Sequence, residues 1–302
     1  MRSPQTVLET LRKHAQETQY QYERLYRNLY NPQFYLLAYQ NLYANKGSMT
    51  PGADGKTISG MGMKRIEDLV KKIRDRSYQP HPARRQYIPK KSGNGLRPLG
   101  IPSADDKLVQ EAVRMILESI YEPNFKQTSH GFRPNRSCHT ALAQIQRTFT
   151  GVSWFVEGDI KGCFDNIDHH ILIDILKRRI KDEAFIDLIW KLLRAGYLED
   201  WMKHQTYSGT PQGSGVSPLL ANIYMNELDQ FMEEYRGRFN KGDKRRFSNA
   251  YVNANHHYAR AKARNAKKWE LMNEEERENA RIMQKELQTT LLSTPSRDQM
   301  DP

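Results

Sequence analysis

The chain has 302 residues, 38% apolar and 27% charged, which suits one large or two ordinary domains with an extensive wet surface. Its net charge of +12 indicates a polyanionic partner, most simply RNA or DNA, against the alternative of a merely basic soluble protein. Two cysteines without a CxxC pair, no long apolar run and no signal-peptide core exclude a disulfide framework, a zinc site, a membrane protein and secretion. We therefore expect a cytoplasmic protein.

Residues 1–45 are predicted to form two helices. The first runs to about Leu29, and Asn31-Pro32 caps and begins the second. Aromatic residues recur every four positions, which favours a helical face docked on a core over a surface that stacks bases. These residues are Tyr22, Tyr26, Tyr30 and Phe34.

Residues 46–102 begin with a loop rich in glycine and proline at 46–55, followed by an amphipathic helix at 64–76. Two short extended segments, 87–89 and 96–102, then flank a glycine turn and predict a hairpin. Its prolines confine it to a sheet edge.

Residues 103–149 are predicted to form two capped helices. Ser103 caps a helix that runs to about Tyr121, with Asp106 at the capping-box position, and Ser137 caps a helix at 138–149.

Residues 154–160, WFVEGDI, predict an apolar strand that ends beside a tight turn at 161–166. Asp159 lies at this strand end, where a sheet presents a catalytic carboxylate. Taken alone, an ordinary strand-end aspartate bonded to backbone N–H groups is the simpler interpretation.

Residues 168–235 are predicted to alternate helix and strand. Helices at 168–179 and 182–195 precede a strand at 201–208, a turn-rich loop at 210–217 and a long helix to about Tyr235.

Residues 236–302 change in composition. Residues 241–268 carry nine Lys or Arg and one Asp, whereas 269–302 carry four Lys or Arg and eight Asp or Glu. Both halves have helical patterns without a strong apolar face, so we predict a charged helical insert outside the core.

Four motifs occur in order along the chain. YIPK at 87–90 leads through the turn to RPLGIP at 97–102, and HGFRPNRS stands at 130–137. DIKGCFDNID follows at 159–168 and TPQGSGVSPLLAN at 210–222. Their order and spacing resemble group II intron-encoded reverse transcriptases. HGFRPNRS favours this class over another non-retroviral lineage.

The resemblance implies an α+β fold, in which a small palm sheet carries Asp159 and mostly helical fingers surround it. The implied divisions are an N-terminal helical extension (1–45), fingers with a template lid loop (46–150), palm (151–168), fingers (169–211), a palm helix (212–235) and the charged helical insert (236–302).

The resemblance also implies a magnesium site with Asp159 as catalytic residue and metal ligand, and Ile160 beside it at the metal. Phosphoryl transfer uses two metal ions roughly 4 Å apart, and Mg²⁺ prefers carboxylate oxygens. The implied nucleotide-binding residues are Lys90 and Arg97 at the triphosphate, Phe164 under the sugar, where it rejects a 2′-OH, and Gln212 beside the nucleotide and primer.

Clustered basic residues predict contacts with RNA phosphates at the hairpin tip, in HGFRPNRS and in the insert. For the insert the alternative is a solvated face that only aids solubility. The residues are Lys91, Arg133, Arg136, Lys244, Arg245, Arg246, Arg260, Lys262, Arg264, Lys267 and Lys268.

One part of the family pattern is missing. The other two metal ligands belong to a Tyr/Phe-Ala-Asp-Asp hairpin after the long helix, and no such motif follows Tyr235. Asp105-Asp106 precedes Asp159 at a helix start, where capping and the helix dipole explain it. We expect an incomplete metal site and interpret the chain as a fragment. His169-His170 and His256-His257 are not expected to bind metal.

The resemblance implies that the full-length protein copies RNA into DNA with Mg²⁺ and assists the splicing and mobility of its intron. Its partners would be intron RNA, an RNA template and a DNA primer, with a homodimer through the fingers as a further option. For the 302-residue chain we expect RNA binding without polymerisation. The rival function, from another class, is a purely RNA-binding assembly module.

Overall fold

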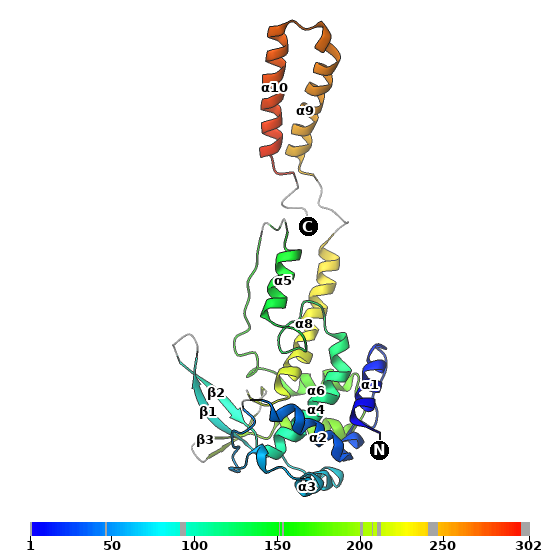
Figure 1. Ribbon diagram of the computed structural model, residues 1–302, viewed down its shortest axis with the longest axis vertical. Helices are drawn as coiled ribbons and strands as arrows, with labels where there is room; N and C mark the ends of the chain where they lie inside the picture. Colours follow the sequence, from blue (N-terminus) through cyan, green and yellow to red (C-terminus); the bar gives the residue numbers. More distant parts are fainter. Residues whose placement is uncertain are drawn as a thin grey trace. The chain divides into compact units, whose positions relative to one another are not determined.

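The computed structural model describes residues 2–45, 47–90, 95–150, 152, 154–199, 202–206, 208–209, 213–240 and 247–296. Its fold is α+β, as the sequence predicts (Figure 1). The chain divides into two compact units. One comprises Met1–Thr150 with Val156–Gln230, and the other comprises Gly151–Phe155 with Phe231–Pro302.

The core of the first unit is built on α4 (Ala104–Tyr121), which is buried along most of its length. Leu108, Ile116 and Leu117 are fully buried, and α1 and α2 pack against this helix. The other helices contribute their apolar faces to the same core. Their bounds are α1 Pro4–Ala15, α2 Pro32–Tyr43, α3 Met63–Arg74, α6 His169–Lys177 and α7 Glu183–Leu193, with short 3-10 turns at Tyr26–Tyr30 (η1), Ile58–Gly60 (η2) and Glu122–Asn124 (η3).

The predicted helix starts are confirmed. The Asn31 side chain accepts a hydrogen bond from the Gln33 amide ahead of Pro32, and Ser103 accepts one from the Asp106 amide. Ser137 forms a reciprocal capping box with Thr140 at the start of α5 (Cys138–Thr148). Each cap satisfies backbone donors that a helix cannot pair internally.

The first helix is shorter than predicted. It ends at Ala15, and the chain then runs as a loop to η1. The Tyr22 amide donates to the Arg179 carbonyl at 2.7 Å, and the Lys181 amide donates to the Tyr22 carbonyl at 2.9 Å, so tertiary pairing replaces helical bonds here. The aromatic residues nevertheless belong to the core, because Tyr22 is 2% exposed and Phe34 is fully buried.

A four-stranded sheet in the order β2-β1-β3-β4 forms from the predicted hairpin and a later segment. β1 and β2 are antiparallel, with Ile88 opposite Arg97. β1 also pairs in parallel with β3, with Ala83 opposite Tyr197, and β3 and β4 form a tight antiparallel pair. The bounds are β1 Ala83–Pro89, β2 Leu96–Ile101, β3 Tyr197–Glu199 and β4 Met202–His204.

The strand predicted at 154–160 is not formed, so Asp159 does not lie on a palm sheet. Trp154 is 83% exposed and Val156 93% exposed. A strand needs a neighbour to pair its N–H and C=O groups, and within the described residues no strand lies beside this segment. The strand prediction for this segment is therefore wrong.

The second unit contains the end of α8 (Ser217–Phe239) and two helices, α9 (Asn249–Lys268) and α10 (Glu274–Ser293), joined through η4 (Trp269–Leu271). Both halves of the insert are thus helical, as predicted. Ala261, Asn265 and Ala280 are buried where α9 meets α10, and the Asn265 side chain donates to the Ala280 carbonyl at 3.3 Å. Among the described helices, none has the length and apolarity to cross a membrane.

Candidate functional site

The loop that begins at Ser208 packs directly on the turn that follows Asp159. The Gly209 amide donates to the Ile167 carbonyl at 2.8 Å, and the Ser208 hydroxyl donates to the Asp165 carbonyl at 3.2 Å. Gly209 has φ of +81°, and a Cβ there would lie 2.7 Å from the carbonyl oxygens of Phe164 and Asp165. Only glycine permits this approach.

A second glycine joins the same loop to the hairpin. Gly213 has φ of +106°, and a Cβ there would lie 2.4 Å from the Gly100 carbonyl oxygen and 3.1 Å from a Leu99 methyl carbon. Just beyond it, the Ser214 hydroxyl and the Gly215 amide donate to Gln110 Oε1 at 3.0 and 3.2 Å. The loop is therefore held against both β2 and α4.

The HGFRPNRS segment reaches the same place. The Asn222 side chain on α8 donates to the Gly131 carbonyl at 2.8 Å. The Phe132 ring meets the Phe164 ring edge to face, with centroids 6.0 Å apart. The four motifs are thus brought together in the first unit, and this convergence defines the candidate site.

Asp159 does not form a magnesium site with the other described residues. It is exposed, and it has no hydrogen bond or ion pair with any of them. No group of three His, Cys, Asp or Glu side chains able to hold a metal occurs in the described ranges. Ile160 beside it is 49% exposed. One exposed carboxylate does not fit two Mg²⁺ ions.

The structure describes three of the four predicted nucleotide contacts. Lys90 and Arg97 are exposed at the hairpin end, where the Lys90 amide donates to the Gly95 carbonyl at 3.0 Å. Phe164 is half-buried and packs against the core, so its ring position is fixed by packing. Gln212 and Lys91 lie outside the described residues.

Arg133 is a structural residue, contrary to the prediction of an RNA contact. Its side chain is 5% exposed and donates to the Glu122 carboxylate at 2.8 Å. The same guanidinium donates to the carbonyls of Lys126 and Ser129, both at 2.8 Å. With these donors used inside the protein, few remain for a phosphate. Arg136 is half-exposed and donates to Gln127.

Asp105 and Asp106 lie at the start of α4 as expected, but the cap of this helix is Ser103, whose side chain accepts from the Asp106 amide. Asp105 forms an ion pair with Arg65 at 2.7 Å. Asp106 is buried and accepts hydrogen bonds from the Tyr78 hydroxyl, the Ser103 hydroxyl and the His81 amide. Burial raises the pKa of Asp106, although these donors favour its carboxylate form. Asp105 thus ties α4 to α3, and Asp106 ties α4 to the segment before β1.

The first histidine pair contributes to packing, whereas the second is exposed. His169 is buried at the start of α6, and its Nε2 donates to the Gly209 carbonyl at 2.6 Å. The His170 ring lies 5.0 Å from the Trp190 ring. His256 and His257 lie on α9 with ring centroids 6.5 Å apart.

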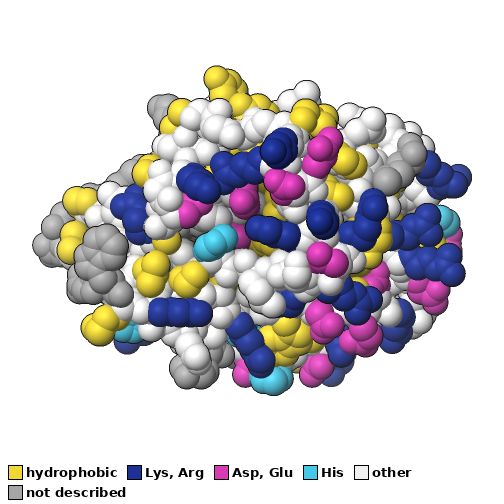
Figure 2. Space-filling model, turned by 90° about the horizontal axis from the view of Figure 1, so that it is seen from below, with side chains coloured by type: hydrophobic (Ala, Val, Ile, Leu, Met, Phe, Trp, Pro, Cys, Tyr) yellow, Lys and Arg dark blue, Asp and Glu magenta, His cyan; other side chains and the backbone are white. Residues whose placement is uncertain are grey.

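Those predicted RNA contacts of the insert that the structure describes are all exposed on α9. They are Arg260, Lys262, Arg264, Lys267 and Lys268, whereas Lys244, Arg245 and Arg246 lie outside the described residues. Figure 2 shows Lys and Arg side chains spread across the surface seen from below, with Asp and Glu side chains among them. Charge alone therefore does not locate an RNA-binding surface.

Comparison with known proteins agrees with these motifs. The family model described as reverse transcriptase (RNA-dependent DNA polymerase) matches residues 88–252. The chain belongs to the reverse transcriptase family. The resemblance drawn from the sequence motifs is thereby confirmed.

The group II intron-encoded protein LtrA of Lactococcus lactis subsp. cremoris is 52% identical over 252 residues, covering 83% of this chain and 42% of LtrA. Protein YkfC of Escherichia coli K12 is 39% identical over 221 residues, covering 70% of this chain and 58% of YkfC. This chain thus spans under half of LtrA. A chain of a solved partial Cas6-RT-Cas1–Cas2 complex aligns with a TM-score of 0.44 and 21% identity over 70% of this chain and 35% of its own, which is too low to carry an inference.

Two residues on α4 that the sequence analysis did not single out hold neighbouring loops in place. Lys107 on α4 donates to the Gly47, Ser48 and Thr50 carbonyls at 3.3, 3.3 and 2.8 Å, and so holds the loop after α2. Gln110, one turn further on, receives the glycine loop. A lysine and a glutamine within a helical pattern carry no local signal of such roles.

Proposed function

We propose that this chain is the fingers and first palm segment of a group II intron-encoded RNA-dependent DNA polymerase. The full-length protein copies RNA into DNA and assists the splicing and mobility of its intron. One observation carries this proposal: four motifs separated in sequence meet, three through the close contacts of Gly209 and Gly213 and the fourth, HGFRPNRS, through Gly131 and Phe132. The domain divisions expected from the sequence are part of the same proposal.

We assign the incoming nucleotide to the region between the β1–β2 hairpin and the turn at 161–166. Lys90 and Arg97 offer exposed cations for a triphosphate, which Arg binds in bidentate fashion and Lys as a point charge. Phe164, fixed by the core and by Phe132, is suited to lie against the sugar and exclude a 2′-OH. Gln212 directly precedes Gly213 and is assigned to the nucleotide and primer.

The 302-residue polypeptide by itself binds RNA and does not polymerise. Polymerisation with Mg²⁺ requires several carboxylates around the metal ions, and Asp159 offers one. Exposed cations on the hairpin and on α9 require no metal to attract phosphates. The partners are intron RNA, an RNA template and a DNA primer in the cytoplasm, with a homodimer as a further option.

Primer extension separates the parts of this proposal. The 302-residue chain, given a primed RNA template, Mg²⁺ and four deoxynucleotides, should give no product above background while shifting labelled RNA in a binding assay. In a protein extended through a Tyr-Ala-Asp-Asp hairpin, Asp159→Ala should abolish extension and leave RNA affinity intact. Asp174→Ala, which changes an exposed carboxylate on α6, is the matched control.

Extension by the 302-residue chain would contradict the proposed inactivity. Loss of RNA affinity in Asp159→Ala would make Asp159 structural. The second candidate is an assembly module that binds RNA without chemistry, favoured by the incomplete metal site. It predicts that the extended protein also gives no product.

A further inference from the structure

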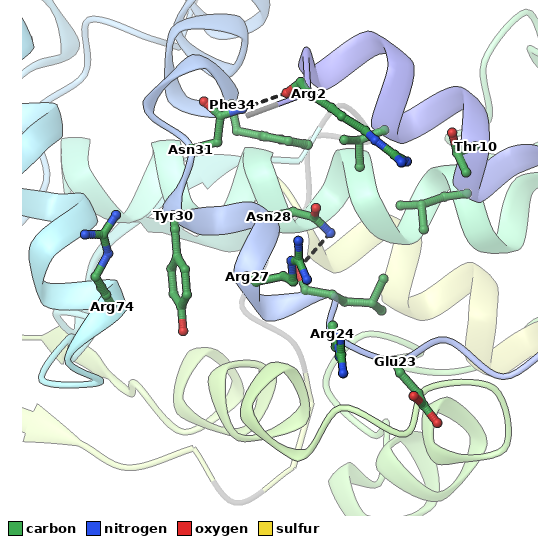
Figure 3. A pocket seen from close by; sticks show the side chains of 13 residues that line it. Arg2, Thr10, Glu23, Arg24, Arg27, Asn28, Tyr30, Asn31, Phe34 and Arg74 are labelled. Atoms are coloured by element: carbon green, nitrogen blue, oxygen red, sulfur yellow. Dashed lines mark hydrogen bonds between the residues drawn. The ribbon is translucent and has the colours of Figure 1, made fainter.

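A cavity of about 560 Å³ lies in the N-terminal part of the first unit, outside the candidate polymerase site. Residues from α1, η1, the start of α2 and the end of α3 line it (Figure 3). Four of the residues that line this cavity are arginines, and one lining residue, Glu23, is acidic. Its volume is in the range of small-molecule sites and far exceeds that of a single inorganic anion.

Three of these arginines are available to a ligand. Arg2, Arg24 and Arg27 are exposed and have no ion pair or side-chain hydrogen bond with any residue of the described ranges. Arg74 differs, because its guanidinium lies over the Tyr30 ring at 5.6 Å from the centroid. In the view of Figure 3, Arg2 lies above Asn28 and Arg27 lies below it. Exposed guanidinium groups that line one cavity suit a phosphate, which each can bind through two N–H donors.

The segment that carries Arg24 and Arg27 is held in place before any ligand binds. Tyr22 is paired to the backbone at residues 179–181, and the Tyr26 amide donates to the Asp182 carboxylate at 2.8 Å. Between these anchors Arg24 has φ of +55°, a left-handed conformation that costs free energy for a residue with a side chain. The packing on both sides maintains it.

The rest of the cavity offers an apolar wall and a hydrogen-bond acceptor. Val7, Leu11 and Leu25 form apolar lining. The Asn28 side chain donates through Nδ2 to the Leu25 carbonyl at 3.0 Å, and this leaves its Oδ1 as an acceptor. A flat base with an exocyclic amino group matches this combination of an apolar wall and one acceptor.

We propose that this cavity binds a nucleoside phosphate. Arg2, Arg24 and Arg27 bind the phosphate, and the apolar wall with Asn28 receives the base. The nucleoside phosphate is either a free nucleotide or one nucleotide of an RNA chain, because both present the same groups. The inference is independent of the polymerase activity.

Calorimetric titration with adenosine 5′-monophosphate, with adenosine, and with a five-nucleotide RNA that lacks terminal phosphates tests the proposal. All proteins carry Lys90→Gln and Arg97→Gln, so that binding at the hairpin does not contribute. Arg2→Gln/Arg27→Gln should weaken binding of the monophosphate or of the RNA at least about tenfold, as expected for lost charged hydrogen bonds. Adenosine should bind weakly to every variant.

Arg12→Gln/Lys13→Gln is the matched control, because it removes the same charge from exposed positions on α1 that do not line the cavity. Its affinities should match those of the parent. Hydrogen exchange should slow at residues 23–34 when ligand is added to the control and stay unchanged in the Arg2/Arg27 variant. If the RNA binds and the monophosphate does not, the cavity takes one nucleotide of an RNA chain. If the monophosphate binds and the RNA does not, the cavity takes a free nucleotide. If neither affinity depends on Arg2 and Arg27, the proposal is wrong.

Discussion

The backbone of Gly213 lies against the carbonyl of Gly100 so closely that a Cβ at position 213 would be 2.4 Å from its oxygen. Gly213→Ala should therefore separate the glycine loop from β2. We expect a loss of about 1–3 kcal/mol in the free energy of unfolding, from overpacking and the unfavourable φ. Urea denaturation measures it.

Gly215→Ala is the control for this prediction, since a Cβ at position 215 would meet nothing within 4 Å. It should change stability by less than about 0.5 kcal/mol. Equal stabilities for the two variants would show that the loop does not need the close contact with the hairpin.

Arg133→Gln should unfold the protein at lower urea concentration without a specific effect on RNA. The substitution leaves Glu122, which is 14% exposed, without its cation, at a cost of about 3–5 kcal/mol if the pair behaves as buried. Arg136→Gln, on the same segment but half-exposed, should cost much less. Normal stability with weakened RNA binding in Arg133→Gln would restore Arg133 as an RNA contact.

Asp106 should make stability depend on pH. Burial raises its pKa above the ordinary 3.8, so between 3.8 and that raised value the folded protein binds more protons than the unfolded chain. The contribution of Asp106 to the free energy of unfolding is therefore fully present below pH 3.8 and is lost as pH rises through the folded-state pKa of this carboxyl group. Urea denaturation across this window should show the parent losing stability relative to Asp106→Asn. A difference independent of pH would contradict the raised pKa.

Phe164→Val, in a protein extended through a Tyr-Ala-Asp-Asp hairpin, should admit ribonucleotides, because the ring no longer blocks the 2′-OH. Competing extension with deoxy- and ribonucleotides measures the change in selectivity. Phe132→Val removes the neighbouring ring, which is 71% exposed, and should affect selectivity less. Unchanged discrimination in Phe164→Val would leave Phe164 with a packing role alone.

Replacing Arg260, Lys262 and Arg264 with Gln should weaken RNA binding and flatten its salt dependence. Each lost phosphate contact reduces the log–log slope by roughly 0.7 on single strands. Lys64, Lys71 and Lys72 on α3 provide a control with the same charge change. If both triple variants match the parent, the basic residues of α9 are not RNA contacts.

Local sequence signals predicted much of this fold. Asn31-Pro32, Ser103 and Ser137 begin helices because each satisfies backbone donors within three residues, which a sequence displays directly. The hairpin followed from its glycine turn. The end of α1 at Ala15 and the course of the chain through Tyr22 were not predictable in this way, because a partner at residues 179–181 determines them.

In the candidate site, too, the features set by local sequence were predictable and those set by distant partners were not. Its motifs were recognisable, but their contacts at Gly209 and Gly213 depend on tertiary approach. Arg133 had the pattern of a surface cation, and only the position of Glu122 makes it structural. The apolar run at 154–160 predicted a strand, yet a strand exists only with a neighbour, and patterning does not supply one.

The parallel pairing of Ala83 with Tyr197 also bears on how the protein forms during synthesis. β1 and β2 can pair soon after they leave the ribosome, because only residues 90–95 separate them in sequence. β3 begins at Tyr197, 96 residues after β2 ends at Ile101, so β1 receives its second neighbour only after a delay on the order of ten seconds. During that interval one edge of the hairpin stays open, so a nascent chain stalled before residue 197 should be the species most dependent on chaperones.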